Sequence, residues 1–210
     1  MAGERGIFIT LEGIEGSGKS TQAARLRDHL VARGFDVVVT REPGGSPIGE
    51  QIRRILLDPS NKKMVPLAEL FLYEASRTQH VAEIIAPALK AGKCVICDRF
   101  FDASTAYQGA ARGLDTAAVG RLNLLATGGI KPDLTLVLDL PADVGLKRLG
   151  RSLDRLESEG LAFHRRVREG YLEAAAAESD RIKVVDGSGS IDDISLRIAQ
   201  VVDTWLASRK

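Results

Sequence analysis

The sequence contains few of the residues that build disulfide-rich or zinc-bound domains. Only two cysteines and three histidines occur in 210 residues. A secreted disulfide scaffold needs several cysteine pairs, and a structural zinc site needs about four closely spaced cysteine or histidine ligands. The composition therefore excludes both classes.

The two cysteines, Cys94 and Cys97, lie in the apolar run CVICDRF. Residues three apart on an extended strand point to opposite faces, so these thiols suit neither a disulfide bond nor joint ligation of a metal. We predict two buried thiols in one strand.

Long apolar segments are also missing. The run from Leu134 to Leu138 is among the longest, and a membrane-spanning helix needs about 20 apolar residues. The first residues, MAGERG, lack the apolar core of a signal peptide. We therefore expect a cytoplasmic protein that has no membrane partner.

No charge of one sign dominates the chain. The 29 basic and 28 acidic residues leave a formal net charge of +1. Such a balance provides no overall field that would recruit nucleic acid or an anionic membrane, so we expect no nucleic-acid partner. Any selectivity for anions must arise locally.

The hydrophobic content of 44% is sufficient for one α/β domain over residues 1–210. Beyond a strand that begins at Ile7, the predicted strands are 35–40, 94–99, 134–140 and 182–186. The predicted helices are 20–33, 47–56, 66–91, 115–126, 142–149, 161–178 and 191–208. Ser46 and Pro47 suit the N-cap and first position of a helix, and Pro87 should bend or interrupt the long region 66–91. This alternation predicts a five-stranded parallel sheet flanked by helices on both faces.

A glycine-rich loop follows the first predicted strand and opens the first helix. Gly13, Gly18, Lys19 and Ser20 satisfy the pattern G-x-x-x-x-G-K-[ST], whose backbone N–H groups surround phosphate oxygens. The strand and helix on either side argue against an incidental turn. The predicted ATP-binding residues are Gly13, Ile14, Glu15, Gly16, Ser17, Gly18, Lys19, Ser20 and Thr21. We thus expect a P-loop NTPase fold, with ATP as co-substrate and Mg²⁺ held by the Ser20 hydroxyl.

The rest of the chain favours transfer of a phosphoryl group over hydrolysis. No N-K-x-D guanine signature is present, and seven arginines stand near predicted loops and strand ends: Arg41, Arg53, Arg77, Arg99, Arg148, Arg151 and Arg155. An acceptor phosphate, with a second pKa of roughly 6, is already nucleophilic at neutral pH and needs no strong base. Guanidinium groups and Mg²⁺ would offset the repulsion between two polyanions.

Five segments in order resemble the thymidylate kinase family, within the nucleoside monophosphate kinases. They are LEGIEGSGKST, TREPGG, YEASR (residues 73–77), DRF-x₄-TAYQG (residues 98–109) and KPDLTLVLDLP. The bacterial form of this family is the better match, because residues 14–17 contain no arginine and a short lid at about 148–160 contains several. Phe100 departs from the family, where tyrosine or histidine is frequent at this position.

The resemblance implies the following contacts with the acceptor nucleotide. Glu15 accepts a hydrogen bond from the sugar 3′-hydroxyl, Tyr73 stacks on thymine, and Arg77 donates to a thymine carbonyl. Ser104 and Gln108 line the base pocket, and Tyr107 lies under the deoxyribose. Arg53 and Arg99 hold the acceptor phosphate.

The resemblance also implies the groups that act on the transferred phosphoryl group. The catalytic residues would be Lys19, Asp98, Arg99, Arg151 and Arg155. Asp98 would orient water bound to Mg²⁺, and the lid arginines would reach the donor phosphates on closure. The choice among Arg148, Arg151 and Arg155 stays open.

The expected reaction is transfer of the γ-phosphoryl group from ATP to dTMP, giving dTDP and ADP, in dTTP biosynthesis. The family is typically a homodimer, and the apolar regions 66–86 and 114–126 are candidate dimer faces. One alternative is a kinase for another deoxynucleotide or for a deoxynucleoside. A second is a P-loop protein that binds ATP for regulation and transfers no phosphate.

Overall fold

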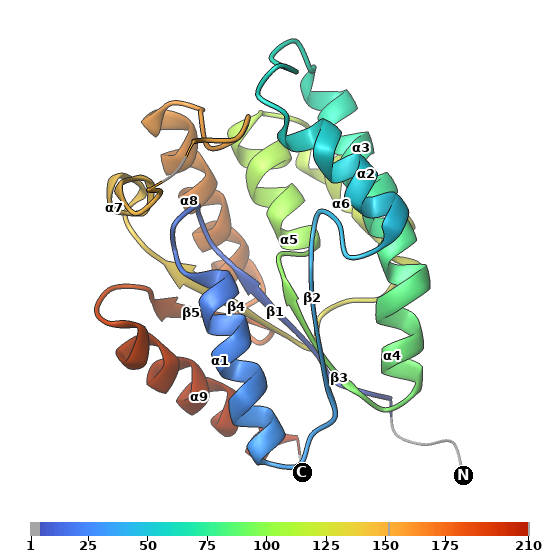
Figure 1. The fold of residues 1–210 in the computed structure, drawn as a ribbon, viewed down its shortest axis with the longest axis vertical. Helices are drawn as coiled ribbons and strands as arrows, with labels where there is room; N and C mark the ends of the chain where they lie inside the picture. Colours follow the sequence, from blue (N-terminus) through green and yellow to red (C-terminus); the bar gives the residue numbers. More distant parts are fainter. Residues whose placement is uncertain (1–4, 151, 210) are drawn as a thin grey trace.

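The centre of the fold is a parallel sheet. The structure, a computed structural model, describes residues 5–150 and 152–209. Its strands are β1 (Phe8–Glu12), β2 (Val37–Arg41), β3 (Cys94–Asp98), β4 (Leu134–Asp139) and β5 (Ile182–Asp186). They form one five-stranded sheet in the order β2-β3-β1-β4-β5, with every neighbouring pair parallel (Figure 1). The predicted five-stranded parallel sheet is confirmed.

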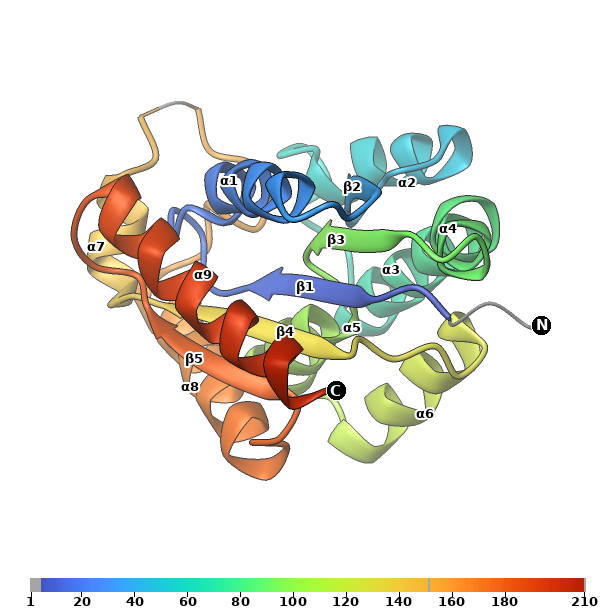
Figure 2. The same cartoon turned by 90° about the horizontal axis from the view of Figure 1, so that it is seen from below.

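Helices cover both faces of this sheet. They are α1 (Lys19–Ala32), α2 (Pro47–Leu57), α3 (Pro66–His80), α4 (Ala86–Lys90), α5 (Phe101–Ser104), α6 (Thr116–Thr127), α7 (Ala142–Lys147), α8 (Leu161–Ala177) and α9 (Ile191–Ser208), with π-helical segments η1 (Val81–Ile85) and η2 (Thr105–Ala111). One face packs against α1 and α9, and the other against η1, α4, η2 and α8. In Figure 2, α1 lies above β1 and α8 lies below the sheet.

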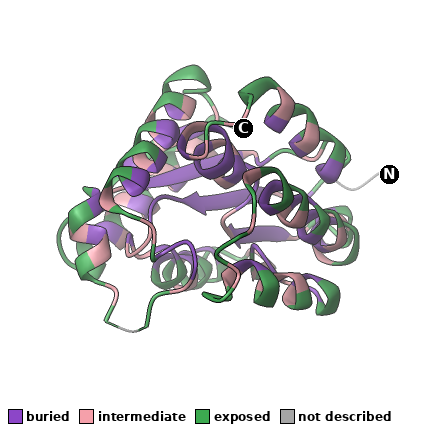
Figure 3. Ribbon diagram, turned by 90° about the horizontal axis from the view of Figure 1, so that it is seen from above, coloured by how far each residue is buried: buried purple, intermediate pink, exposed green. Residues whose placement is uncertain are grey.

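The three central strands β1, β3 and β4 are buried, the edge strands β2 and β5 are partly exposed, and the outer surfaces of the helices are exposed (Figure 3). Within β3, Cys94 and Ile96 belong to the apolar cluster under α1, whereas Val95 and Cys97 belong to the cluster under α4. Both thiols are buried and free. The predicted pair of strand thiols on opposite faces is therefore confirmed.

Two helix starts follow the expected capping chemistry. Ser46 accepts a hydrogen bond from the Gly49 backbone N–H at 3.2 Å, and Pro47 is the first residue of α2. Ser190 and Asp193 form a reciprocal capping box at the start of α9. The bounds of β5 and α9 match the predicted segments.

The interruption predicted at Pro87 begins earlier. Helix α3 ends at His80, and the next five residues form η1 before α4 resumes at Ala86. Proline has no N–H, and its ring collides with the carbonyl four residues before it in a regular helix. The wider π turn, in which the Ala86 N–H bonds to the Val81 carbonyl, lies directly before Pro87. It avoids that collision, so the helical segment continues as α4.

The helical segment made by α5 and η2 was not predicted. It contains small residues and lacks a clear apolar stripe, and it is stabilised by close packing on α8. A Cβ atom added to Gly170 of α8 would lie 2.7 Å from the Cβ of Ala110. This approach places Tyr107 and Gln108 over the carboxyl ends of the central strands.

In the part of the chain that the structure describes, no helix is both long and apolar enough to span a membrane.

Candidate active site

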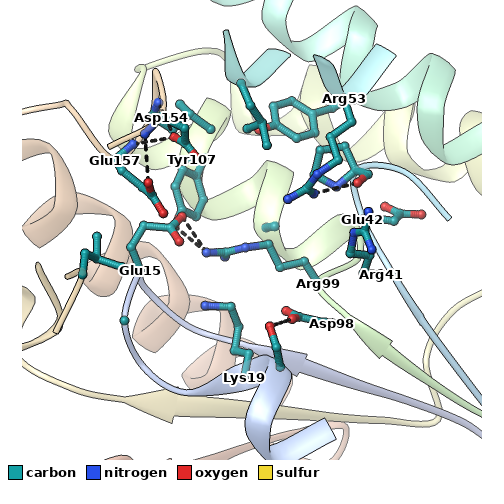
Figure 4. A pocket seen from close by; sticks show the side chains of 18 of the residues that line it. Glu15, Lys19, Arg41, Glu42, Arg53, Asp98, Arg99, Tyr107, Asp154 and Glu157 are labelled. Atoms are coloured by element: carbon teal, nitrogen blue, oxygen red, sulfur yellow. Dashed lines mark hydrogen bonds and ion pairs between the residues drawn. The ribbon is translucent and has the colours of Figure 1, made fainter. Parts of the chain in front are cut away.

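A cavity of about 360 Å³ opens at the carboxyl ends of β1 and β3. Its wall comes from the loop 13–18, the start of α1, the ends of β2 and β3, α2, α3, α5, η2 and the segments 148–149 and 154–157. Open α/β sheets bind ligands at this edge, where the order of the strands reverses around β1. Figure 4 shows charged side chains from these elements converging on the cavity.

The loop 13–18 is compact because its glycines lie against other backbone segments. Gly16 has φ +71°, and a Cβ atom there would lie 2.0 Å from the Gly145 carbonyl oxygen of α7. Gly13 has φ +137°, and its Cβ atom would lie 2.6 Å from the Leu138 carbonyl oxygen. No other residue type fits either position without moving the backbone.

Lys19 folds over the loop. Its ammonium group donates to the Ile14 carbonyl at 2.7 Å and to Ser17 Oγ at 3.3 Å. Burial, together with the nearby Arg99 charge, lowers the pKa of Lys19 to about 8. These hydrogen-bond partners are neutral, so an incoming phosphate can take the ammonium group without breaking an ion pair.

Arg99 reaches across the cavity from the end of β3. Its φ of +70° makes it the one non-glycine residue with positive φ in residues 5–150 and 152–209. The guanidinium donates to the Gly13 carbonyl at 2.8 Å, to Glu15 Oε1 at 2.7 Å and to the hydroxyls of Tyr107 and Tyr171 at 3.1 Å. These bonds stabilise an otherwise strained backbone turn that aims the side chain at the loop.

Glu15 faces the cavity from the loop. Burial alone would raise the pKa of its carboxyl, but Arg99 and Lys19 lower that pKa to about 2. The Tyr107 hydroxyl also donates to Oε1 at 2.9 Å. The group is therefore a carboxylate that accepts hydrogen bonds across the physiological pH range.

Ser20 and Asp98 form a second polar pair beside Lys19. The Ser20 hydroxyl donates to Asp98 Oδ2 at 2.5 Å. The pair brings a hydroxyl at the start of α1 beside a carboxylate oxygen at the end of β3. Both are hard oxygen ligands of the kind that Mg²⁺ binds, directly or through water.

The far end of the cavity is lined by Tyr73, Ser104, Gln108 and Arg53. Arg53 donates to the Pro43 carbonyl at 2.8 Å. The family resemblance places these four side chains in the acceptor site, and the fold brings all of them to one cavity.

Arg77 lies behind this wall and is 1% exposed. It donates to Glu42 at 2.8 Å, to Glu74 at 2.6 Å and to Ser104 Oγ at 3.0 Å. Of these partners, Glu42 and Ser104 line the cavity. Arg77 therefore contacts two residues that line the cavity and does not line it itself.

The predicted lid arginines have different environments. Arg148 lines the cavity, and Arg151 lies outside the described residues. Arg155 does not line the cavity and is 6% exposed. Its guanidinium is paired with Glu69 at 2.6 Å and bonded to the Leu56 carbonyl at 2.7 Å. In this arrangement the charge of Arg155 is paired with a buried carboxylate.

Sequence reasoning missed two residues that support Arg99: Tyr171, which contacts it, and Glu12, which contacts Tyr171. Glu12 is fully buried and accepts hydrogen bonds from the Phe100 N–H at 2.6 Å and the Tyr171 hydroxyl at 2.7 Å. Tyr171 in turn accepts from Arg99. An acidic residue at the end of an apolar strand was the available signal for Glu12, whereas Tyr171 lies 159 residues further along the chain.

The chain resembles known proteins along most of its length. The model for the thymidylate kinase family matches residues 11–198. This chain belongs to the thymidylate kinase family. Thymidylate kinase from Syntrophotalea carbinolica is 56% identical over 200 residues, which cover 91% of this chain and 93% of that protein. Thymidylate kinase from Geobacter sp. strain M21 is 51% identical over 205 residues, covering 94% and 91%.

A solved structure extends the likeness to three dimensions. The crystal structure of thymidylate kinase from Ehrlichia chaffeensis has a TM-score of 0.78 at 34% identity, over 95% of this chain and 99% of that chain. The phosphate loop, the turn at Arg99 and the cavity between them thus lie in a fold shared with this family.

Proposed function

We propose that the protein transfers the γ-phosphoryl group of ATP to dTMP, producing dTDP and ADP. The observation that carries this proposal is the joining of two half-sites in one cavity. A phosphate loop with Lys19 lies at one end, and a pocket lined by Tyr73, Ser104 and Gln108 lies at the other. Membership of the thymidylate kinase family supports dTMP as the acceptor.

The chain's own residues position and neutralise the reactants. Lys19 would leave the Ile14 carbonyl and bind the β- and γ-phosphates of ATP. Arg99, between the loop and the acceptor pocket, would bind the acceptor phosphate and reduce the repulsion between the two anions. Glu15, already ionised, would accept a hydrogen bond from the sugar 3′-hydroxyl. The acceptor oxygen needs no base, because the phosphate is largely ionised at neutral pH.

We propose Mg²⁺ as the cofactor, held through Ser20 and, across a water molecule, Asp98. When bound, the ion would neutralise charge that develops on the β- and γ-phosphate oxygens. Among residues 5–150 and 152–209 no cluster of three histidine, cysteine or acidic side chains could hold a metal ion. The ion would therefore depend on substrate phosphates and water for its remaining ligands, as Mg²⁺ commonly does.

The reaction can be tested with one acceptor panel. Purified protein with ATP and Mg²⁺ is offered dTMP, dUMP, dCMP, dAMP, thymidine or no acceptor, and products are separated by chromatography. We expect dTDP to form faster than any other product. A faster reaction with dCMP or thymidine would identify a different kinase, and ATP hydrolysis without any transfer would indicate a regulatory ATP-binding protein.

We also propose that the protein acts in the cytoplasm, where its nucleotide substrates occur, as a homodimer. Helix α3 exposes Leu67 and Phe71, one turn apart, at 49% and 51%, and α6 exposes Leu124 and Leu125 at 54% and 78%. The two helices pack side by side, so these side chains can form one apolar face. Light scattering should give twice the chain mass, and Phe71→Glu should give monomers; a monomeric wild-type protein would contradict the proposal.

A further inference from the structure

Glu69 is a buried carboxylate that the proposed mechanism does not use. It lies in the first turn of α3 and is 0% exposed. Its Oε1 accepts from Gln108 at 2.8 Å and from Arg112 Nε at 3.2 Å. Its Oε2 accepts from Arg112 Nη2 at 3.1 Å and from Arg155 at 2.6 Å. Burial opposes ionisation, but the hydrogen bonds from Arg112 and Gln108 lower the pKa of Glu69 below its ordinary value.

This carboxylate fixes the orientation of the Gln108 amide. An ionised carboxylate only accepts hydrogen bonds, so Gln108 must present its NH₂ group to Glu69. The amide carbonyl is then the group that Gln108 can offer to the cavity, which it lines. The side chain is 1% exposed. A reversed amide would therefore bury its carbonyl oxygen against the Glu69 carboxylate, where two acceptors would face each other without a donor.

An amide carbonyl at this wall distinguishes two classes of pyrimidine. Thymine and uracil carry an N–H donor at ring position 3, whereas cytosine carries an acceptor there. The carbonyl would bond to the first class and repel the second. A site that hydrogen-bonds a substrate group can reject an analogue that lacks the group by about 10⁴-fold or more, whereas shape alone gives far less.

We propose that Glu69 is the positioning residue that sets the base preference of the acceptor site, by holding the Gln108 carbonyl toward the base. The inference rests on the proposed function, because it assumes that the base lies against Gln108. Glu69 touches no substrate in this account and acts only through Gln108.

Residues 154–157, which precede α8, include a second arginine partner of Glu69. Arg155 comes from this segment, and its backbone N–H also bonds to the Leu57 carbonyl at the end of α2. The neighbouring residues Asp154 and Glu157 line the cavity beside Tyr107 (Figure 4). The orientation of Gln108 is thus tied to the placement of a segment that also forms the wall of the cavity.

The substitution Glu69→Gln gives a directional test. Oε2 receives two guanidinium donors, from Arg112 and Arg155, so the amide oxygen of the new side chain should take that place. Its NH₂ group would then face Gln108 and favour the reversed amide, which presents a donor to the base. We expect the ratio of kcat/KM for dTMP over dCMP to fall at least tenfold. The loss should come mainly through a higher KM for dTMP, with KM for ATP within twofold.

Glu159→Gln is the matched control. Glu159 loses the same charge and pairs with the same arginine, accepting from Arg112 Nη1 at 2.6 Å, but Gln108 bonds to Glu69 and not to Glu159. We expect its acceptor ratio to stay within twofold of the wild type. A ratio that falls equally in both variants would overturn the inference, because loss of charge near Arg112 would then explain the effect.

The remaining outcomes separate the inference from the proposed function. A wild-type enzyme without a preference for dTMP over dCMP would overturn the proposed function and this inference together. A preference that survives in Glu69→Gln, even with lower rates on both acceptors, would overturn the inference alone. Should that variant not fold by circular dichroism, Glu69→Asp keeps the charge and withdraws the carboxylate by one methylene; an unchanged acceptor ratio there would also overturn it.

Discussion

The two ends of the cavity differ in how their charges are held. The phosphate end comprises residues 13–21, Asp98 and Arg99, and the base end comprises Glu42, Glu69, Tyr73, Arg77, Ser104 and Gln108. At the phosphate end, Lys19 bonds to neutral oxygens, and among the described residues Arg99 has one carboxylate partner within ion-pair distance, Glu15. At the base end, Arg77 is paired with two carboxylates, and Glu69 is paired with two arginines.

From this difference we infer that the two ends of the cavity have different functions. A charge whose partners are neutral, or that has a single carboxylate partner, can be transferred to a ligand phosphate when it arrives, because at most one ion pair must break. Charges with several buried partners are fixed, and they shape the wall against which a neutral base would lie. Substitutions at the phosphate end should therefore affect transfer more than folding, and substitutions at the base end should affect both folding and acceptor choice.

The largest expected effect concerns Lys19. Lys19→Ala removes the ammonium group that would bind the β- and γ-phosphates, and loss of one such electrostatic contact lowers kcat by roughly 10³-fold. The thermal midpoint should change little, because the variant also removes a buried charge, whose desolvation opposes folding. Steady-state kinetics and circular dichroism check both points. An unfolded variant, or one with more than a tenth of wild-type kcat, would contradict the division of tasks.

Arg77→Ala should show the opposite balance. It leaves Glu42 and Glu74 without their shared guanidinium in a buried site, and breaking such a pair destabilises a fold by about 3–5 kcal/mol. Urea unfolding measures this loss directly. The matched variant Arg41→Ala breaks an ion pair with Glu50 that is about half exposed and should cost about 1 kcal/mol or less. Equal losses in the two variants would remove the contrast between buried and exposed pairs.

A smaller effect distinguishes Arg155 from Arg148. Arg155→Met should raise KM for dTMP about tenfold, the usual scale for losing a charge-assisted hydrogen bond, and leave KM for ATP within twofold. Arg148→Met, at a residue that lines the cavity, should raise KM for ATP instead. If Arg155→Met raises KM for ATP and spares dTMP, Arg155 reaches the donor phosphates as the sequence suggested.

The smallest effect is a pH dependence that separates Glu12 from Glu15. Burial and the nearby Asp102 raise the pKa of Glu12 to about 8, whereas Arg99 and Lys19 overcome burial and lower the pKa of Glu15 to about 2. Glu12 binds a proton more tightly in the folded state, so its contribution to stability is lost as pH rises from about 4.5 to 8. Glu15 contributes stability above pH 4.5 that is lost as pH falls toward 2.

Glu12→Gln should consequently flatten the decline of the thermal midpoint between pH 5 and pH 8. Glu15→Gln should leave that interval unchanged and flatten the decline in acid. Calorimetric scans at a series of pH values, from acid to pH 8, provide the measurement. If the midpoint rises from pH 5 to pH 8, and rises equally in the wild type and in Glu12→Gln, the Glu12 carboxyl is ionised in the folded protein. That result would contradict the prediction.

The sequence predicts the phosphate end better than the base end. The loop 13–18 is a local pattern, and its shape follows from glycines and one lysine that are close in the chain. Strand β5 and helix α9 were placed from periodicity, and the Ser46 cap from local hydrogen bonding. These features depend on neighbours in sequence, which a single chain displays directly.

The base end depends on partners that are far apart. Arg77 meets Glu42 across 35 residues, and Arg155 meets Glu69 across 86. No periodicity relates such residues, so the sequence showed that Arg155 is cationic and did not show that a buried carboxylate holds it. The π-helical segment η2 was missed for the same reason, because packing against α8 stabilises it.

Calorimetric titration of dTMP and of a non-hydrolysable ATP analogue, with Mg²⁺, tests the division of the cavity most directly. The proteins compared are the wild type, Lys19→Ala and Arg77→Ala. We predict that Lys19→Ala loses affinity for the analogue and retains dTMP binding within about threefold, and that Arg77→Ala does the reverse. Equal losses for both ligands in either folded variant would contradict the placement of donor and acceptor at opposite ends of the cavity.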